Sequence, residues 1–121
     1  MTATTPDELI RKKCVPCEGG VPPLTPEEVA QMLQGMPAWH ATEGGQRIRR
    51  EWVARNFIAA IDFFNKVAQL AESEGHHPDL HLIGYRNVAI EVWTHAIGGL
   101  SENDFILAAK IDQIPWEVKK S

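Results

Sequence analysis

The clearest hydrophobic pattern in the chain lies between residues 85 and 94, where apolar side chains occupy every second position. Val88, Ile90 and Val92 fall on one side of this alternation. A period of two is typical of a β-strand with one buried face. Residues 77–83 form a second strand-like run, and Gly84 separates the two runs. The segment therefore predicts an antiparallel β-hairpin.

An earlier segment predicts a second hairpin. Residues 39–42 and 46–53 read as strands, and a Glu-Gly-Gly turn at 43–45 separates them. Two glycines between such runs favour a tight reversal of the chain. Ile48, together with Trp52, is expected to face the core.

Three helices are predicted from capping signals and from apolar residues at helical spacing. The first begins at Thr25, where Thr-Pro-x-Glu forms a capping box, and ends near Gly35. The second spans about residues 56–73, and the third begins after Ser101. The expected apolar stripe of the second helix is Phe57, Ile61, Phe64, Ala68 and Ala71, widened by Ile58, Val67 and Leu70. The third is expected to bury Phe105, Leu107, Ala108 and Ile111.

The order of these elements, α-β-β-α-β-β-α, predicts an α+β fold. We expect a four-stranded antiparallel sheet with three helices packed on one face. Residues 1–24 are rich in proline, glycine and threonine, and such a stretch cannot hold long helices or central strands. We interpret residues 1–24 as an extended arm and residues 25–121 as one domain.

Composition and charge exclude several classes of function. The net charge is −4 and the pI is about 5.7, whereas nucleic-acid-binding surfaces usually carry a basic excess. No apolar run approaches the ~18 residues that a membrane span needs. The first nine residues lack the basic and apolar regions of a secretory signal. We therefore expect a cytoplasmic protein with no membrane partner and no direct nucleic-acid partner.

Three histidines are the strongest candidates for chemistry. His76 and His77 are adjacent and precede Pro78, at the junction between the second helix and a strand, and His95 follows the last predicted strand. The two arms of the second hairpin could bring these imidazoles together. Imidazole exchanges protons near neutral pH, so the trio favours proton-transfer chemistry. The alternative is that His76 and His77 are polar surface residues.

Metal binding is the competing interpretation of these residues. His77 and His81 are four residues apart, but on a strand this spacing separates them by ~13 Å, too far for one ion. Cys14 and Cys17 form a lone C-x-x-C pair, whereas a structural zinc site needs four ligands. Reduced cysteines or a local disulfide remain the simpler interpretation, and we expect no metal and no cofactor.

Several motifs together resemble the pterin-4a-carbinolamine dehydratase family. They are Glu-Gly-His-His-Pro-Asp at 74–79, Tyr-Arg-Asn-Val at 85–88, Thr-His at 94–95, Gly-Leu-Ser-Glu-Asn-Asp at 99–104 and Leu-Ala at 107–108. The resemblance implies the fold predicted above and assembly into homodimers or homotetramers. It also implies dehydration of 4a-hydroxytetrahydropterins such as 4a-hydroxytetrahydrobiopterin to quinonoid dihydropterin. That reaction needs no metal and regenerates the cofactor of aromatic amino acid hydroxylases.

The resemblance also assigns roles to individual residues. His76, His77 and His95 match the family's active-site histidines, with His76 and His95 expected to transfer protons and His77 to position the pterin. Residues expected to contribute to substrate binding are Glu72, Trp39, Pro78, Asp79 and Thr94.

A second hypothesis is a protein-binding factor without essential catalysis. Some relatives of this kind have lost the histidines and act in Rubisco assembly, and the vertebrate form also stabilises dimers of a homeodomain transcription factor. Asn103 stands where the vertebrate form has an arginine at the rim of the pocket, so substrate affinity or assembly is expected to differ. The presence of His76, His77 and His95 favours the enzyme, because a scaffold has no physical need for all three.

Overall fold

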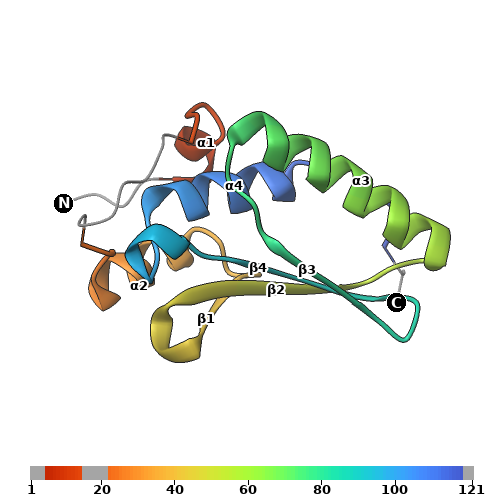
Figure 1. The fold of residues 1–121 in the computed structure, drawn as a ribbon, viewed down its shortest axis with the longest axis horizontal. Helices are drawn as coiled ribbons and strands as arrows, with labels where there is room; N and C mark the ends of the chain where they lie inside the picture. The colour runs from red at the N-terminus through yellow and green to blue at the C-terminus, as the bar shows by residue number, and fades with distance from the viewer. Residues whose placement is uncertain (1–4, 15–21, 119–121) are drawn as a thin grey trace.

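The sheet has four antiparallel strands in the order β1-β2-β4-β3, as predicted. The structure is a computed structural model that describes residues 5–14 and 22–118. The first hairpin joins β1 (His40–Thr42) and β2 (Arg47–Val53) through η1 (Glu43–Gly45), and the second joins β3 (Asp79–Ile83) and β4 (Asn87–Val92). The central pair β2–β4 therefore joins the two hairpins into one sheet (Figure 1).

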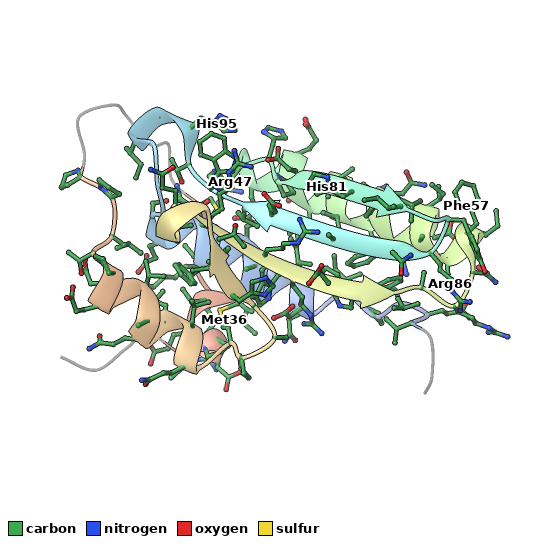
Figure 2. All side chains as sticks on the ribbon, turned by 90° about the horizontal axis from the view of Figure 1, so that it is seen from below. Met36, Arg47, Phe57, His81, Arg86 and His95 are labelled. Atoms are coloured by element: carbon green, nitrogen blue, oxygen red, sulfur yellow. The ribbon has the colours of Figure 1, made fainter. Side chains whose placement is uncertain are left out.

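Three longer helices complete the α+β fold: α2 (Pro26–Gln34), α3 (Phe57–Glu74) and α4 (Glu102–Asp112). Helices α3 and α4 lie above the same face of the sheet, and α2 lies at the end of this layer (Figure 1). A short 3-10 turn, η2 (His95–Ile97), links β4 to α4. The opposite face of the sheet is turned away from α3 and α4, as Figure 2 shows from that side.

The helix ends follow the capping signals in the sequence. Thr25 and Glu28 form the predicted capping box at the start of α2. Gly75 ends α3 with φ of 67°, a left-handed conformation that glycine adopts without steric cost. Because α3 ends at this residue, the next two positions, His76 and His77, leave the helix and enter the path toward β3.

The predicted apolar stripe of α3 is only partly correct: Val67 and Ala71 are buried, and Phe64 and Leu70 pack against the core. The residues that α3 buries are Ala59, Ala60, Phe63, Val67 and Ala71. By contrast, Phe57, Ile58 and Ile61 are 49%, 66% and 36% exposed. Apolar residues cover more than one side of this helix, so periodicity alone could not select the side that packs on the sheet.

The segment before residue 14 is more ordered than an extended arm. It contains a short helix, α1 (Pro6–Leu9), and the side chain of Leu9 is fully buried in the core. Lys12 forms an ion pair of 3.0 Å with Glu102, and the Cys14 N–H donates to Glu74 Oε1 at 2.8 Å. Cys14 is a free thiol, whereas Cys17 lies outside the described residues. Residues 5–14 thus pack against α3 and α4, and the boundary at residue 25 remains a prediction.

Candidate active site

Two connections of the chain meet at one end of the sheet and carry the predicted site residues. The first runs from Gly75 through His76, His77 and Pro78 into β3. The second leaves β4 after Val92 and reaches α4 through η2. The two connections are linked through Asp104, which contacts His76 of the first and Thr94 of the second.

His76 is joined to α4 by a buried carboxylate. Its Nε2 lies 2.6 Å from Asp104 Oδ1. The Asp104 side chain is 0% exposed and that of His76 is 13% exposed. Charge-assisted contacts of this kind are stronger than bonds between neutral groups. Asp104 therefore fixes the orientation of the His76 ring.

The second oxygen of Asp104 closes the start of α4. Oδ2 accepts from the Ser101 N–H at 2.8 Å and from the Thr94 hydroxyl at 2.8 Å. Thr94 Oγ1 also lies 2.9 Å from Ser101 Oγ. Asp104 thus both completes the capping box of α4, whose N-cap residue is Ser101, and contacts His76. Thr94, predicted as a substrate-binding residue, is buried and supports this carboxylate instead of facing solvent.

His77 has a partner of its own on α3. Its Nε2 lies 2.8 Å from Glu72 Oε1, and both side chains are exposed. Glu72, predicted as a substrate-binding residue, therefore contacts His77. This pair forms an accessible rim beside the more enclosed His76.

Glu74 has its hydrogen-bond partners on Cys14 and Lys110. Burial raises the pKa of its carboxyl group, but the Cys14 N–H and the Lys110 ammonium outweigh this effect and leave the pKa below its ordinary value. Lys110 Nζ lies 2.8 Å from Glu74 Oε2. Glu74 therefore belongs to the contacts that hold residues 5–14 against α3 and α4.

His95 lies against the ring of Trp93. The two ring centroids are 3.7 Å apart, and the ring planes are inclined by 40°. The Trp93 indole N–H donates to Asp79 Oδ2 at 3.2 Å. Asp79 therefore contacts Trp93, which in turn contacts His95. The Arg47 guanidinium lies 4.4 Å from the centroid of the Trp93 ring. Figure 2 shows Arg47 and His95 at the same end of the sheet, with Phe57 and Arg86 at the other.

The structure does not bring Trp39 to this group of residues. Its side chain is 2% exposed, and its indole N–H donates to the Asp112 carboxylate at 3.0 Å. Asp112 ends α4, eight residues after Asp104, and this spacing corresponds to ~12 Å along a helix. Trp39 packs edge-on against Trp52 with a centroid distance of 6.0 Å. The position of Trp39 therefore does not support the expected contact with substrate.

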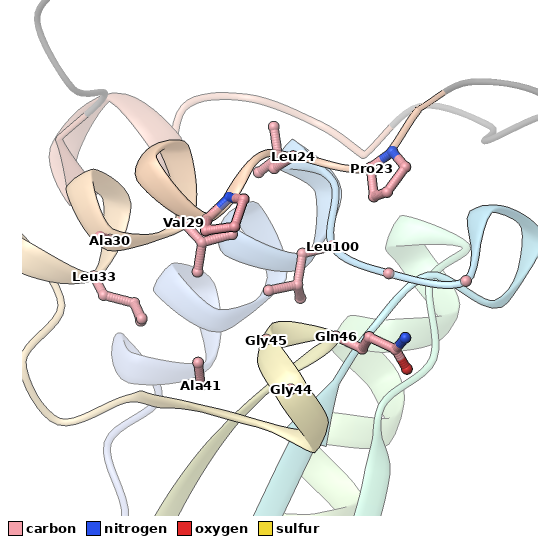
Figure 3. Close-up of a pocket in the computed structure, with 13 residues that line it drawn as sticks. Pro23, Leu24, Val29, Ala30, Leu33, Ala41, Gly44, Gly45, Gln46 and Leu100 are labelled. Atoms are coloured by element: carbon pink, nitrogen blue, oxygen red, sulfur yellow. The ribbon is translucent and has the colours of Figure 1, made fainter.

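An apolar cavity of about 360 Å³ lies beside α2 (Figure 3), and its described lining includes no histidine. Val29 and Leu33 of α2, Ala41 of β1 and Leu100 contribute to its lining. The glycines of η1, the pair Gly98-Gly99 and Gln46 also line it, and so do Pro23, Leu24, Pro26 and Ala30. None of the described residues that line it has a titratable side chain, so these residues offer no group for proton transfer.

No cluster of three histidine, cysteine, aspartate or glutamate side chains in residues 5–14 and 22–118 could hold a metal ion. His77 pairs with Glu72. His81 lies on β3 with its Nε2 3.9 Å from Glu91 Oε2. The two histidines of the metal hypothesis thus have different carboxylate neighbours.

Comparison with known proteins shows the family of this chain. The family described as Pterin 4 alpha carbinolamine dehydratase matches residues 22–114. The chain belongs to this family. It is 49% identical over 113 residues to "Pterin-4-alpha-carbinolamine dehydratase 2, mitochondrial" of Arabidopsis thaliana, a match that covers 91% of this chain and 60% of that protein. It is 46% identical over 109 residues to a "Putative pterin-4-alpha-carbinolamine dehydratase" of Methylococcus capsulatus, covering 90% and 95% of the two chains.

A solved structure supports the fold of this dehydratase-family chain. The crystal structure of a transcriptional coactivator/pterin dehydratase from Brucella melitensis superposes with a TM-score of 0.69 at 29% sequence identity. The match covers 74% of this chain and 95% of the other. The four-stranded sheet and its helices are therefore those of a known family member.

Sequence reasoning missed three residues that organise the site. They are Asp104, Trp93 and Arg47. Asp104 already belonged to the family motif and to the capping box, so the motif contained the signal. Nothing in the local sequence indicated that Arg47 and Trp93 would meet, because they lie on different strands and are 46 positions apart.

Proposed function

We propose that this chain dehydrates 4a-hydroxytetrahydropterins, such as 4a-hydroxytetrahydrobiopterin, to quinonoid dihydropterin and water. The observation that carries the proposal is the pairing of His76 with the buried carboxylate of Asp104. Membership of the dehydratase family supplies the substrate class. A hydro-lyase of this kind needs acid and base groups, and His76, His77 and His95 are the candidates for these roles.

The chemistry assigns a task to each histidine. The bond between C4a and its hydroxyl oxygen breaks, the hydroxyl takes a proton and leaves as water, and N5 gives up a proton. An Nε2–H donated to Asp104 leaves Nδ1 of His76 as the acceptor nitrogen, so His76 is suited to be the base. His95 is exposed and is assigned to protonate the hydroxyl. His77, oriented by Glu72 at the rim, positions the pterin together with Pro78 and Asp79.

The experiment that tests the proposal is stopped-flow dehydration of synthetic 4a-hydroxytetrahydropterin. His76→Ala and His95→Ala are each expected to lower kcat by about 10²–10⁴-fold, the range for one acid–base group. His40→Ala is the matched control, because His40 is exposed on β1. Circular dichroism establishes that the variants are folded. Near-normal rates in both variants would refute the assignment, and no acceleration by the wild type would favour the protein-binding hypothesis.

We also propose that the chain forms a homo-oligomer. Exposed apolar side chains gather on two elements: Phe57, Ile58 and Ile61 on α3, and Leu80 and Ile83 on β3. β3 is an edge strand of the sheet. Exposed apolar side chains and an unpaired strand edge favour association with another chain. A second copy of this chain is the proposed partner that would cover the exposed apolar side chains of α3 and of the edge strand β3.

The assembly is tested by light scattering with size-exclusion chromatography. Wild-type protein is expected to have the mass of a dimer or tetramer. Ile58→Lys or Ile83→Lys is expected to reduce this mass, whereas Gln69→Lys, a change at another exposed position of α3, leaves it unchanged. A wild type that stays monomeric at micromolar concentrations would contradict the proposal.

The cytoplasmic location also remains a proposal. No helix in the described part of the chain is long and apolar enough to cross a membrane. The Arabidopsis relative is named as a mitochondrial protein. Fractionation of the native host distinguishes the two locations, and recovery of the chain in an organelle would contradict a cytoplasmic one.

A further inference from the structure

The geometry points to Trp93 as a positioning residue that holds the His95 imidazole in place for the reaction. This inference rests on the proposed function and adds to it a residue outside the predicted site. The contact itself is the centroid distance of 3.7 Å between the two rings. Trp93 acts through His95, and it is therefore distinguished from the catalytic residues.

His95 needs such a support because its own surroundings constrain it little. It is exposed and opens η2, a turn of three residues. An exposed side chain on a short turn exchanges between rotamers on the picosecond to nanosecond scale. A flat aromatic surface restricts these rotamers and adds an attractive contact between the rings.

Trp93 is in turn fixed by residues of three strands. Its indole N–H donates to Asp79 Oδ2 on β3 at 3.2 Å. Arg47 of β2 lies over its ring at 4.4 Å from the centroid and pairs with Glu91 of β4 at 3.0 Å. Asp79 and Glu91 face each other directly in the sheet register. The indole therefore contacts side chains of β2 and β3, two strands that both pair with β4.

The alternation of the strand explains how the site is divided. Val92 and Thr94 are buried on the side of the helices, where Thr94 bonds to Asp104. Trp93 lies between them in sequence and contacts Arg47 and Asp79 of the open face. The end of β4 thus supports His76 through Thr94 and Asp104 on one side, and His95 through Trp93 on the other. Trp93 thus contacts His95, and its neighbour Thr94 bonds to the carboxylate that contacts His76.

The test compares Trp93→Leu, which removes the aromatic face, with Trp93→Phe, which keeps a ring but removes the N–H donor to Asp79. Trp93→Leu is expected to lower kcat by about tenfold, since a misplaced group loses rate, with KM changed by less than about threefold. Trp93→Phe is expected to recover most of that loss. Tyr85→Leu is the matched control and is expected to keep the wild-type kcat, because it removes an exposed aromatic ring that lies under the Arg86 guanidinium, a contact outside the site.

A second measurement does not depend on activity. The carbon-bound ring protons of His95, assigned by comparison with His95→Ala, are expected to show an upfield NMR shift from the Trp93 ring. Trp93→Leu is expected to abolish this shift and Trp93→Phe to retain part of it. Circular dichroism and thermal unfolding establish that each variant is folded.

The outcomes separate the two proposals. An active wild type with an unchanged kcat in folded Trp93→Leu, or with no ring-current shift at His95, overturns the positioning role alone. A Trp93→Phe variant as slow as Trp93→Leu also overturns it. A wild type that does not accelerate dehydration overturns the proposed function, and with it the catalytic meaning of the contact between Trp93 and His95.

Discussion

His76 Nε2 and Asp104 Oδ1 lie 2.6 Å apart, and this contact joins the chain after α3 to the first turn of α4. The other oxygen of the same carboxylate caps α4 through the Ser101 N–H. One buried group thus supports both a helix end and an imidazole. Stability and activity are expected to change together when it is altered.

Asp104→Asn tests this double role. The amide keeps the shape of the side chain but removes the charge that pairs with His76 and the second acceptor oxygen. We expect kcat to fall by about 10²-fold and the free energy of unfolding to fall by about 1–3 kcal/mol, the cost of poorly satisfied buried polar groups. Stopped-flow dehydration and urea unfolding measure the two effects.

Glu102→Gln is the matched control for Asp104→Asn. Glu102 lies in the same first turn of α4, but its side chain is exposed and pairs with Lys12. Such surface pairs contribute only about 0–1 kcal/mol, and kcat is expected to stay at the wild-type value. If Asp104→Asn loses stability but keeps its full kcat, Asp104 is a cap and nothing more.

Glu72→Gln tests the exposed pair with His77. We expect the free energy of unfolding to change by less than about 1 kcal/mol, because both side chains are open to solvent. KM is expected to rise several-fold because the orientation of His77 at the rim is weakened. Glu51→Gln, a change of another exposed glutamate, provides the control. Unchanged steady-state kinetics in Glu72→Gln would remove Glu72 from the site.

The pH dependence of stability is expected to include a contribution from Glu74. Burial raises the pKa of Glu74, but the Cys14 N–H and Lys110 lower it further, so the folded pKa lies below the ordinary value of 4.5. The unfolded chain then binds more protons at acidic pH. The contribution is complete above about pH 4.5 and is lost as the pH falls through the folded pKa.

Urea midpoints measured from neutral to acidic pH test this sign. Glu74→Gln is expected to make the acid loss of stability shallower than in the wild type. Glu91 adds to the wild-type slope in the same direction: its burial raises its pKa, but Arg47 and Arg49 lower it further. A Glu74→Gln variant with the full wild-type slope would contradict the assignment.

Cys14 is expected to be an unreactive thiol in the folded protein. Burial, followed by the nearby Glu74 carboxylate, raises its pKa to about 12, and the thiolate is the reactive form. In a Cys17→Ser background, the disulfide reagent DTNB is expected to modify Cys14 only after denaturant is added. Rapid modification of the native protein at pH 8 would show that residues 5–14 open readily.

The sequence predicted most of the architecture because the local signals agreed. Alternation at Val88, Ile90 and Val92 identified β4, and the capping residues Thr25 and Ser101 placed the starts of α2 and α4. The packed side of α3 could not be predicted because Phe57 and Ile61 are as apolar as the residues that are buried. Helical periodicity finds a side only where the opposite side is polar.

The site was predicted in part for a related reason. The histidines are visible in sequence as an unusual residue type before a proline, but their partners come from distant positions. Asp104 is 28 residues from His76, and Arg47 meets Trp93 only because β2 and β4 pair. Such contacts depend on which strands are neighbours in the sheet and on their register. The local sequence of either strand does not specify its neighbour.

The attachment of residues 5–14 has a consequence for synthesis of the protein. Lys12 binds a partner 90 positions later, and Leu9 is covered in the same core as α4. The first described segment is therefore translated long before its docking surface exists, and such long-range closure is slow. Asp104, the partner of His76, arrives with that same late helix. A ribosome-bound chain is thus expected to acquire its activity in one step when α4 is released, rather than gradually as the chain lengthens.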